Sequence, residues 1–457
     1  MHISSVRNFS AKWMVLLGCV GSAIISGYIV SRGYAVGPIL GGVIFFGLFL
    51  TSLKSPMVIM CVYPLSFIDA FQDRLMVGGV TPGIYLGILV FIVFLSQVIQ
   101  HKVILRDIPR TWLALLCFFP LLLLGRFLVA GSDLRVILTF GGQILVAISY
   151  LALLRNPNRV YGVIVSIIVV SLVMSVGQIM ALFWSDTLDM LTTSLQHGEY
   201  LRVAGLARDP NYAALLMNIG YSYALGLALG QSKSGKRLRA TVLSSGAVLL
   251  AIGVVLTASR GGLLALAVVN FLFLAMPTSG RKRALLAVPL VFVVVWWASR
   301  FFANDLVIGI FARSAPDFLL NDPSNVARLA EVEVGITRLM HGDIWLGVGD
   351  PELTYHNTYI DLLSFAGIPA LISFLAVFLR AIFANLDLSR RRLNTSGTLA
   401  LSNVAAIISL LIVGSAIGIE FEKVPWLVLA VGLATVLCYQ TLRADCQSAP
   451  AMDWENF

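Results

Sequence analysis

The chain has 457 residues, of which 58% are hydrophobic and only 12% are charged, and its formal net charge is +9. Soluble globular domains carry about 25% charged residues, so this chain has too few to cover a soluble surface of its size. The composition therefore excludes a soluble multi-domain enzyme and an intrinsically disordered chain. The sequence contains neither a Walker A motif nor a zinc signature, so an ATP-driven pump and a zinc enzyme are not expected.

Apolar runs of about 17–25 residues recur along the chain, and a helix of that length crosses the hydrocarbon core of a bilayer. They predict an all-α, polytopic integral membrane protein with about 12–14 transmembrane helices. GxxxG spacings at Gly83–Gly87 and Gly226–Gly230 predict close helix packing. In chain order, the predicted spans are 13–30, 36–53, 56–70, 82–100, 111–130, 134–154, 160–183, 210–230, 240–257, 261–276, 284–303, 357–384, 398–418 and 425–442.

The segments that connect the spans fall into two alternating sets, of which one is short and basic. The positive-inside rule assigns the basic set and both termini to the cytoplasm, and anionic lipid there accounts for the excess charge without a nucleic acid. Two long loops, 184–209 and 304–355, then lie on the outer side, where we expect any chemistry to occur. Apolar residues among charged ones predict a short helix around 329–339 in the second loop, resting at the membrane surface.

His356 opens the predicted span that follows the second long loop, in the segment Tyr355-His356-Asn357-Thr358-Tyr359. A helix N-terminus disfavours an imidazolium, so a neutral imidazole at this position suits a general base. The alternative interpretation is an interfacial aromatic cluster that contains a hydrogen-bonded histidine.

Arginines near the outer face form a second group of candidates. Arg202 and Arg208 precede a span, and Arg260 lies in Ser259-Arg260-Gly261-Gly262, between two short apolar runs. A charged side chain there is costly unless it faces a polar cavity or a partner, and arginine suits paired hydrogen bonds to phosphate. We therefore expect arginines from separate segments to converge on a diphosphate. The alternatives are plain loop cations at Arg202 and Arg208, and side chains that reach lipid phosphate at Arg260 and Arg126.

A series of short motifs lies between about residues 200 and 385. The motifs are Arg202-Val203-Ala204-Gly205, Asp209-Pro210-Asn211, Ser259-Arg260-Gly261-Gly262, Gly347-Val348-Gly349, His356-Asn357-Thr358-Tyr359-Ile360-Asp361-Leu362-Leu363 and Gly367-Ile368-Pro369. In order, spacing and outer-face placement, this series resembles the O-antigen ligase/polymerase superfamily. The resemblance implies a glycosyltransferase C-like enzyme of the bacterial inner membrane. Such an enzyme moves a glycan en bloc from undecaprenyl diphosphate to an acceptor hydroxyl at the periplasmic face.

The same resemblance implies roles for individual residues. His356 becomes the base on the acceptor hydroxyl and Asn357 orients it, while Arg202 and Arg260 bind the donor diphosphate, with Arg328 as a further candidate. Neither a metal ion nor another cofactor is implied. The acceptor is lipid A-core in a ligase, or a growing O-antigen or exopolysaccharide chain in a polymerase. A protein acceptor is a lesser option.

The motifs also suggest three regions in the chain. They are an N-terminal transmembrane bundle over 1–200, a catalytic region over 201–385 that includes the loop 304–355, and a C-terminal transmembrane hairpin with a cytoplasmic tail over 386–457. The competing class is a polysaccharide-related transporter or flippase. It is disfavoured because transporters place ionisable residues near the bilayer midplane on inverted repeats. No role follows for Asp209, Asp361 and Ser364.

Overall fold

The computed structural model describes residues 36–69, 81–100, 108–130, 134–184, 192–196, 200–233, 236–275, 323–342, 344–347, 355–391, 395–419 and 422–448. Within these ranges, seven helices are long and apolar enough to cross a membrane. The chain is therefore a helical, multi-pass membrane protein, as predicted. The predicted spans 13–30 and 284–303 lie outside the described residues.

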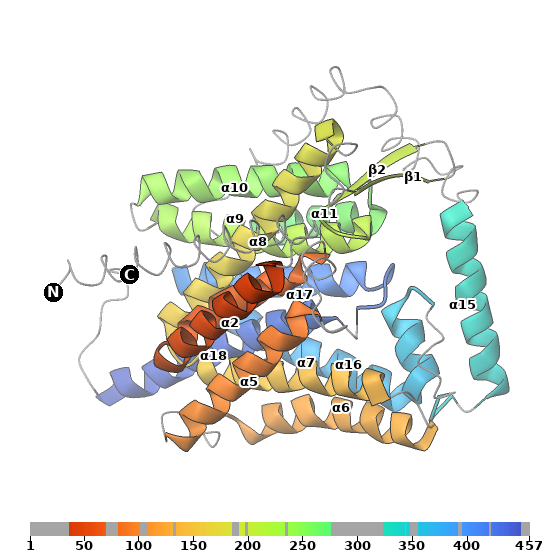
Figure 1. The fold of residues 1–457 in the computed structure, drawn as a ribbon, viewed down its shortest axis with the longest axis horizontal. Coiled ribbons are helices and arrows are strands. Elements are labelled where there is room, and N and C mark those ends of the chain that lie inside the picture. The colour runs from red at the N-terminus through yellow and green to blue at the C-terminus, as the bar shows by residue number, and fades with distance from the viewer. Residues whose placement is uncertain are drawn as a thin grey trace.

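The first part of the chain is helical throughout its described ranges (Figure 1). Its elements are α2 (Val36–Lys54), α3 (Pro56–Val62), the 3-10 helix η1 (Tyr63–Phe67), α5 (Pro82–Ile99), α6 (Arg110–Ala130), α7 (Leu134–Leu153) and α8 (Pro157–Trp184). The predicted span 56–70 is a short α-helix followed by η1 rather than one straight helix. Pro64 explains the break, because proline lacks the backbone N–H of a continuing α-helix.

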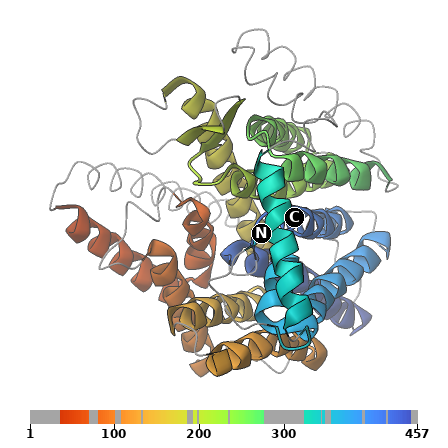
Figure 2. The same ribbon diagram turned by 90° about the vertical axis from the view of Figure 1, so that its right-hand side faces the viewer.

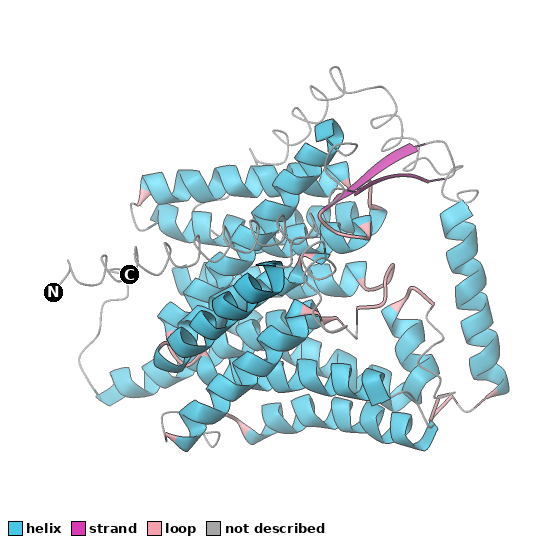
Figure 3. Cartoon of the chain, viewed as in Figure 1, coloured by secondary structure: helices cyan, strands magenta, loops and turns pink. Residues whose placement is uncertain are grey.

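The second part contains the elements that build the candidate site. They are β1 (Thr192–Gln196), β2 (Tyr200–Gly205), α9 (Pro210–Lys233), α10 (Arg237–Leu256), α11 (Arg260–Ala275), α15 (Pro323–His341), α16 (Thr358–Arg391), α17 (Thr395–Val413) and α18 (Lys423–Ser448). The antiparallel pair β1–β2 lies where the sequence predicted only a long loop (Figure 3). Helix α15 confirms the helix predicted around 329–339.

Helix α9 is the centre of the bundle, since all of its most apolar stretch is buried. It packs against α8, α10, α11 and α17. The predicted close packing at Gly226 and Gly230 occurs against α17, where an added Cβ would collide with Ser402 and Thr398. These glycines therefore let the two helix backbones approach closely.

Helix α15 lies at one edge of the molecule, where it contacts α16. Its axis runs across the direction of the long bundle helices in Figure 1, and Figure 2 shows it crossing in front of the bundle. The next helix, α16, is kinked at Ala366 and Gly367, where Gly367 has a φ of 73°. The short turn 344–347 contacts this kink, because the N–H of Ile368 donates to the carbonyl of Ile344 (3.0 Å).

Arg126, near the end of α6, also contacts this turn. Its Nη2 donates to the carbonyl oxygen of Gly347 at 2.7 Å. The expectation that Arg126 reaches out to lipid phosphate is therefore wrong, because its guanidinium satisfies a backbone carbonyl within the protein.

Candidate active site

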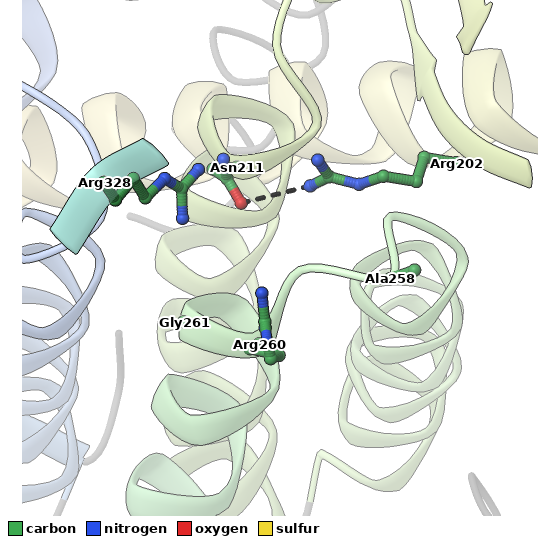
Figure 4. A pocket seen from close by; sticks show the side chains of 6 residues that line it. All are labelled: Arg202, Asn211, Ala258, Arg260, Gly261 and Arg328. Atoms are coloured by element: carbon green, nitrogen blue, oxygen red, sulfur yellow. Dashed lines mark hydrogen bonds between the residues drawn. The ribbon is translucent and has the colours of Figure 1, made fainter. Parts of the chain in front are cut away.

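Three arginines from distant parts of the chain line one pocket (Figure 4). Arg202 comes from β2, Arg260 is the first residue of α11, and Arg328 comes from α15. Their guanidinium groups point toward a common space in Figure 4. The structure thus brings together the three arginines that the sequence analysis selected, whereas Arg208 is exposed and does not line the pocket.

Arg202 is almost fully buried, with 3% of its surface exposed. Its Nη2 donates to Oδ1 of Asn211 (3.2 Å), and its Nε donates to the carbonyl of Thr257 (3.4 Å). These bonds hold the guanidinium at the pocket, and arginine is well suited to paired hydrogen bonds with a phosphate. A pocket wall of this kind is suited to an anionic ligand.

Asn211 is a pocket residue that the sequence analysis gave no role. Its Oδ1 accepts hydrogen bonds from Arg202 and from the hydroxyl of Ser259 (2.7 Å). Its Nδ2 is buried and has no hydrogen-bond partner among the described residues. Since an unsatisfied buried donor is costly, this amide is a further group that an anion in the pocket would satisfy.

Asp209 explains why Asn211 is in place. Its Oδ1 accepts from the backbone N–H groups of Asn211 (2.6 Å) and Tyr212 (3.1 Å), and Pro210 is the first residue of α9. This is the arrangement of a helix N-cap followed by proline. Asp209 therefore caps α9 at the pocket, which settles the role that the sequence left open.

Ser259 caps the second helix that begins at the pocket. Its hydroxyl accepts from the N–H of Gly262 (3.1 Å), and the preceding Ala258 has a φ of 49°. The short Ser-Arg-Gly-Gly segment thus turns sharply into α11 and leaves Arg260 and Gly261 on the pocket wall. A helix N-terminus carries partial positive charge, so α11 adds to the attraction for an anion.

The pocket offers hydrogen-bond donors rather than metal ligands. Its cavity volume is about 20 Å³, room for about one water molecule. No group of three His, Cys, Asp or Glu side chains in the described residues has the arrangement of a metal site. The chemistry that fits this donor set is phosphate recognition.

His356 lies outside this pocket, in the turn that precedes α16. Its side chain is exposed, and its φ of 48° is in the left-handed region, which few non-glycine residues adopt. Such strained positions often occur at functional sites, and histidine tolerates this region better than most residues do. The exposure leaves the imidazole accessible from outside.

Asp361 holds the backbone of this turn from inside. It is fully buried, and its Oδ1 accepts from the N–H of Tyr355 at 2.7 Å. This bond spans His356 and ties the residue before it to the first turn of α16. The motifs implied no role for Asp361, although an acidic residue one helical turn after a helix start is a recognisable signal for such a bond.

Asn357 caps α16. Its Oδ1 accepts from the N–H groups of Tyr359 (3.0 Å) and Ile360 (3.3 Å), and its Nδ2 donates to the carbonyl of Ser415 (3.0 Å). The bonds fix the start of α16 against the segment after α17. Asn357 thus positions the backbone beside His356, and a direct part in the chemistry stays a prediction. The neighbouring candidate Ser364 is buried in α16.

Helix α15 connects the two groups of candidates. Gly335 packs closely on α16, since an added Cβ would lie 2.6 Å from Ile360 and 3.4 Å from Tyr355. Arg328 is seven residues earlier, about 10 Å along the helix axis. One rigid helix therefore borders the His356 turn at one point and supplies an arginine to the pocket at another.

A carboxyl pair lies near the start of α9. The backbone N–H of Arg208 donates to Oδ2 of Asp69 (3.3 Å), and Asp69 in turn influences Glu422. Burial raises the pKa of the Glu422 carboxyl, the charge of Asp69 raises it further, and the charge of Lys423 opposes the shift. The fold therefore shifts the Glu422 carboxyl toward protonation relative to an exposed glutamate.

A scan against protein-family models gives no match to this chain, and a search of curated proteins gives none either. The resemblance to the O-antigen ligase/polymerase superfamily therefore rests on the sequence motifs.

Proposed function

We propose that the protein is a membrane glycosyltransferase that moves a glycan en bloc from undecaprenyl diphosphate to an acceptor hydroxyl. The observation that supports this most strongly is the pocket in which Arg202, Arg260 and Arg328 converge from β2, α11 and α15. The negative charge of a lipid-linked diphosphate complements the arginines of the pocket. Its lipid tail requires a protein that lies in the membrane, as this multi-pass protein does.

The protein must stabilise the leaving group and accept a proton from the acceptor. The bond between the sugar and the diphosphate breaks, and its electron pair leaves on the diphosphate, whose growing charge the arginines stabilise. The acceptor oxygen forms the new glycosidic bond and loses its proton, for which the exposed His356 is our candidate base. Arginines stabilise this leaving group without a metal ion.

We place the reaction at the periplasmic face of the bacterial inner membrane, with both termini in the cytoplasm and a glycosyltransferase C-like arrangement of about 12–14 spans. The acceptor that we favour is lipid A-core, which makes the protein an O-antigen ligase. This choice rests on the His356-Asn357 segment, which resembles the ligases most. An O-antigen or exopolysaccharide polymerase uses the same donor chemistry.

Gel electrophoresis of lipopolysaccharide from a deletion strain tests this proposal. Core without any O-chain indicates a ligase, and core that carries one repeat unit indicates an O-antigen polymerase. Normal lipopolysaccharide with loss of capsule or slime indicates an exopolysaccharide polymerase. Unchanged surface polysaccharide of every kind would contradict the proposed function.

A further inference from the structure

The turn 344–347 between α15 and α16 is held firmly on its inner side. The carbonyl of Ile344 accepts from Ile368, and the carbonyl of Gly347 accepts from Arg126. A Cβ at Gly347, whose φ is 70°, would lie 2.7 Å from the backbone nitrogen of Ala366, and one at Gly367 would overlap the carbonyl of Trp345. The turn backbone is therefore packed directly against the kink of α16.

The outer side of the same turn is apolar and exposed. Ile344, Trp345 and Leu346 are 42%, 63% and 56% exposed, and Met340 in the last turn of α15 is 78% exposed. We refer to these four residues as the turn patch. Four neighbouring large apolar side chains in water are unfavourable, and such patches usually mark a contact with a membrane or a partner.

The position of the turn patch on α16 identifies what covers it. Ile372, Leu379 and Phe383 are exposed large apolar residues of α16, and their spacing places them on one face of a membrane-spanning helix. Ile368, which is hydrogen-bonded to the turn, lies one helical turn before Ile372. The patch thus begins where the lipid-facing row of α16 ends.

We propose that the turn patch inserts into the lipid of the membrane that the protein spans and anchors α15 at the bilayer surface. Three observations support lipid rather than a protein partner: continuity with the lipid-facing row, the orientation of α15 across the bundle helices in Figures 1 and 2, and the presence of Trp345. Tryptophan is enriched where a membrane meets water. The anchor fixes the height of α15, and therefore of Arg328, above the membrane.

Spin labelling in lipid nanodiscs tests this proposal independently of any transferase activity. Nitroxides are attached at Met340→Cys and Trp345→Cys, and at Arg338→Cys as a matched control. Arg338 is exposed and lies two residues before Met340, on roughly the opposite side of α15. The unaltered protein, treated in the same way, measures the background from its native cysteines.

The expected result is that labels at 340 and 345 collide with dissolved oxygen more than with a water-soluble nickel complex, at a depth of about 5–10 Å below the lipid headgroups. The label at 338 should show the opposite preference. Equal access of nickel to all three labels would overturn the proposal, because the patch would then face water. Spin–spin broadening at 340 or 345 would also overturn it, because a second copy of the chain would then cover the patch.

Discussion

The arginine pocket and the His356 turn both border α15, yet they are built differently. The pocket has the buried Arg202 in its wall, and two capped helices, α9 and α11, begin beside it. His356 is exposed, and only the backbone around it is fixed, by Asp361 and Asn357. In our account, the difference reflects two substrates. The donor diphosphate binds to positive charge that is already in place, whereas the acceptor must enter from outside.

The largest expected effect on glycan transfer is that of replacing the exposed His356. His356→Ala should lower the rate of glycan transfer by a factor of about 10²–10⁴, because it removes the base, while donor binding stays unchanged. In vitro transfer from a purified lipid-linked donor measures the rate. His341→Ala, which removes another exposed histidine of the described region, is the control and should transfer normally. Normal transfer by His356→Ala would exclude it as the base.

Substitutions of the pocket arginines should also lower the rate of glycan transfer, by a smaller factor. Arg202→Ala and Arg260→Ala should each lower transfer by about 10²–10³, because each removes a charged donor from the leaving diphosphate. Arg202→Lys should recover only part of the loss, since lysine lacks the planar fork. The matched control is Arg208→Ala, which removes an exposed arginine six residues from Arg202. Equal losses at Arg202 and Arg208 would contradict a specific pocket.

The sequence predicted the spanning helices and the arginines of the pocket better than it predicted the residues that position them. Apolar runs located the described spanning helices. Arg202 was singled out just before a span and Arg260 at a break between two apolar runs, because a charge near the membrane is costly enough to be informative. Asn211 and Asp361 were not assigned, since their importance depends on hydrogen bonds that only the folded structure shows. The β1–β2 hairpin was also missed, because its short strands carry little periodic signal.

Arg126 shows why position in a span is not enough to interpret an arginine. Its place near a helix end is typical of a side chain that reaches lipid phosphate, but its partner is the carbonyl of Gly347, 221 residues away in sequence. Only the fold brings the end of α6 to this turn.

The kink of α16 should matter for folding more than for chemistry. Gly367→Ala should destabilise the protein by at least about 1–2 kcal/mol, because alanine is strained at a positive φ and its Cβ would overlap the carbonyl of Trp345. Thermal unfolding in detergent measures the effect. Gly125→Ala is the control, since an added Cβ there meets nothing within 4 Å. Equal melting temperatures for the two variants would show that the kink is not a tightly packed element.

The smallest expected effect is at Glu422. Because the folded protein raises the pKa of this carboxyl, protonation stabilises the fold, and that contribution is lost as the pH rises through the raised pKa. The melting temperature should therefore rise as the pH is lowered from neutral toward mildly acidic values. Glu422→Gln should weaken this dependence and be the more stable protein at neutral pH. An unchanged dependence would show that Glu422 does not contribute to it.

Binding of radiolabelled undecaprenyl diphosphate to the purified protein in nanodiscs tests the central claim most directly. We predict that His356→Ala binds this lipid as the unaltered protein does. Arg202→Ala, Arg260→Ala and Arg328→Ala should bind it about tenfold more weakly or worse, as expected for loss of a charged hydrogen bond. Equal binding by all four variants, or loss of binding in His356→Ala alone, would contradict the assignment of the arginine pocket to the donor diphosphate.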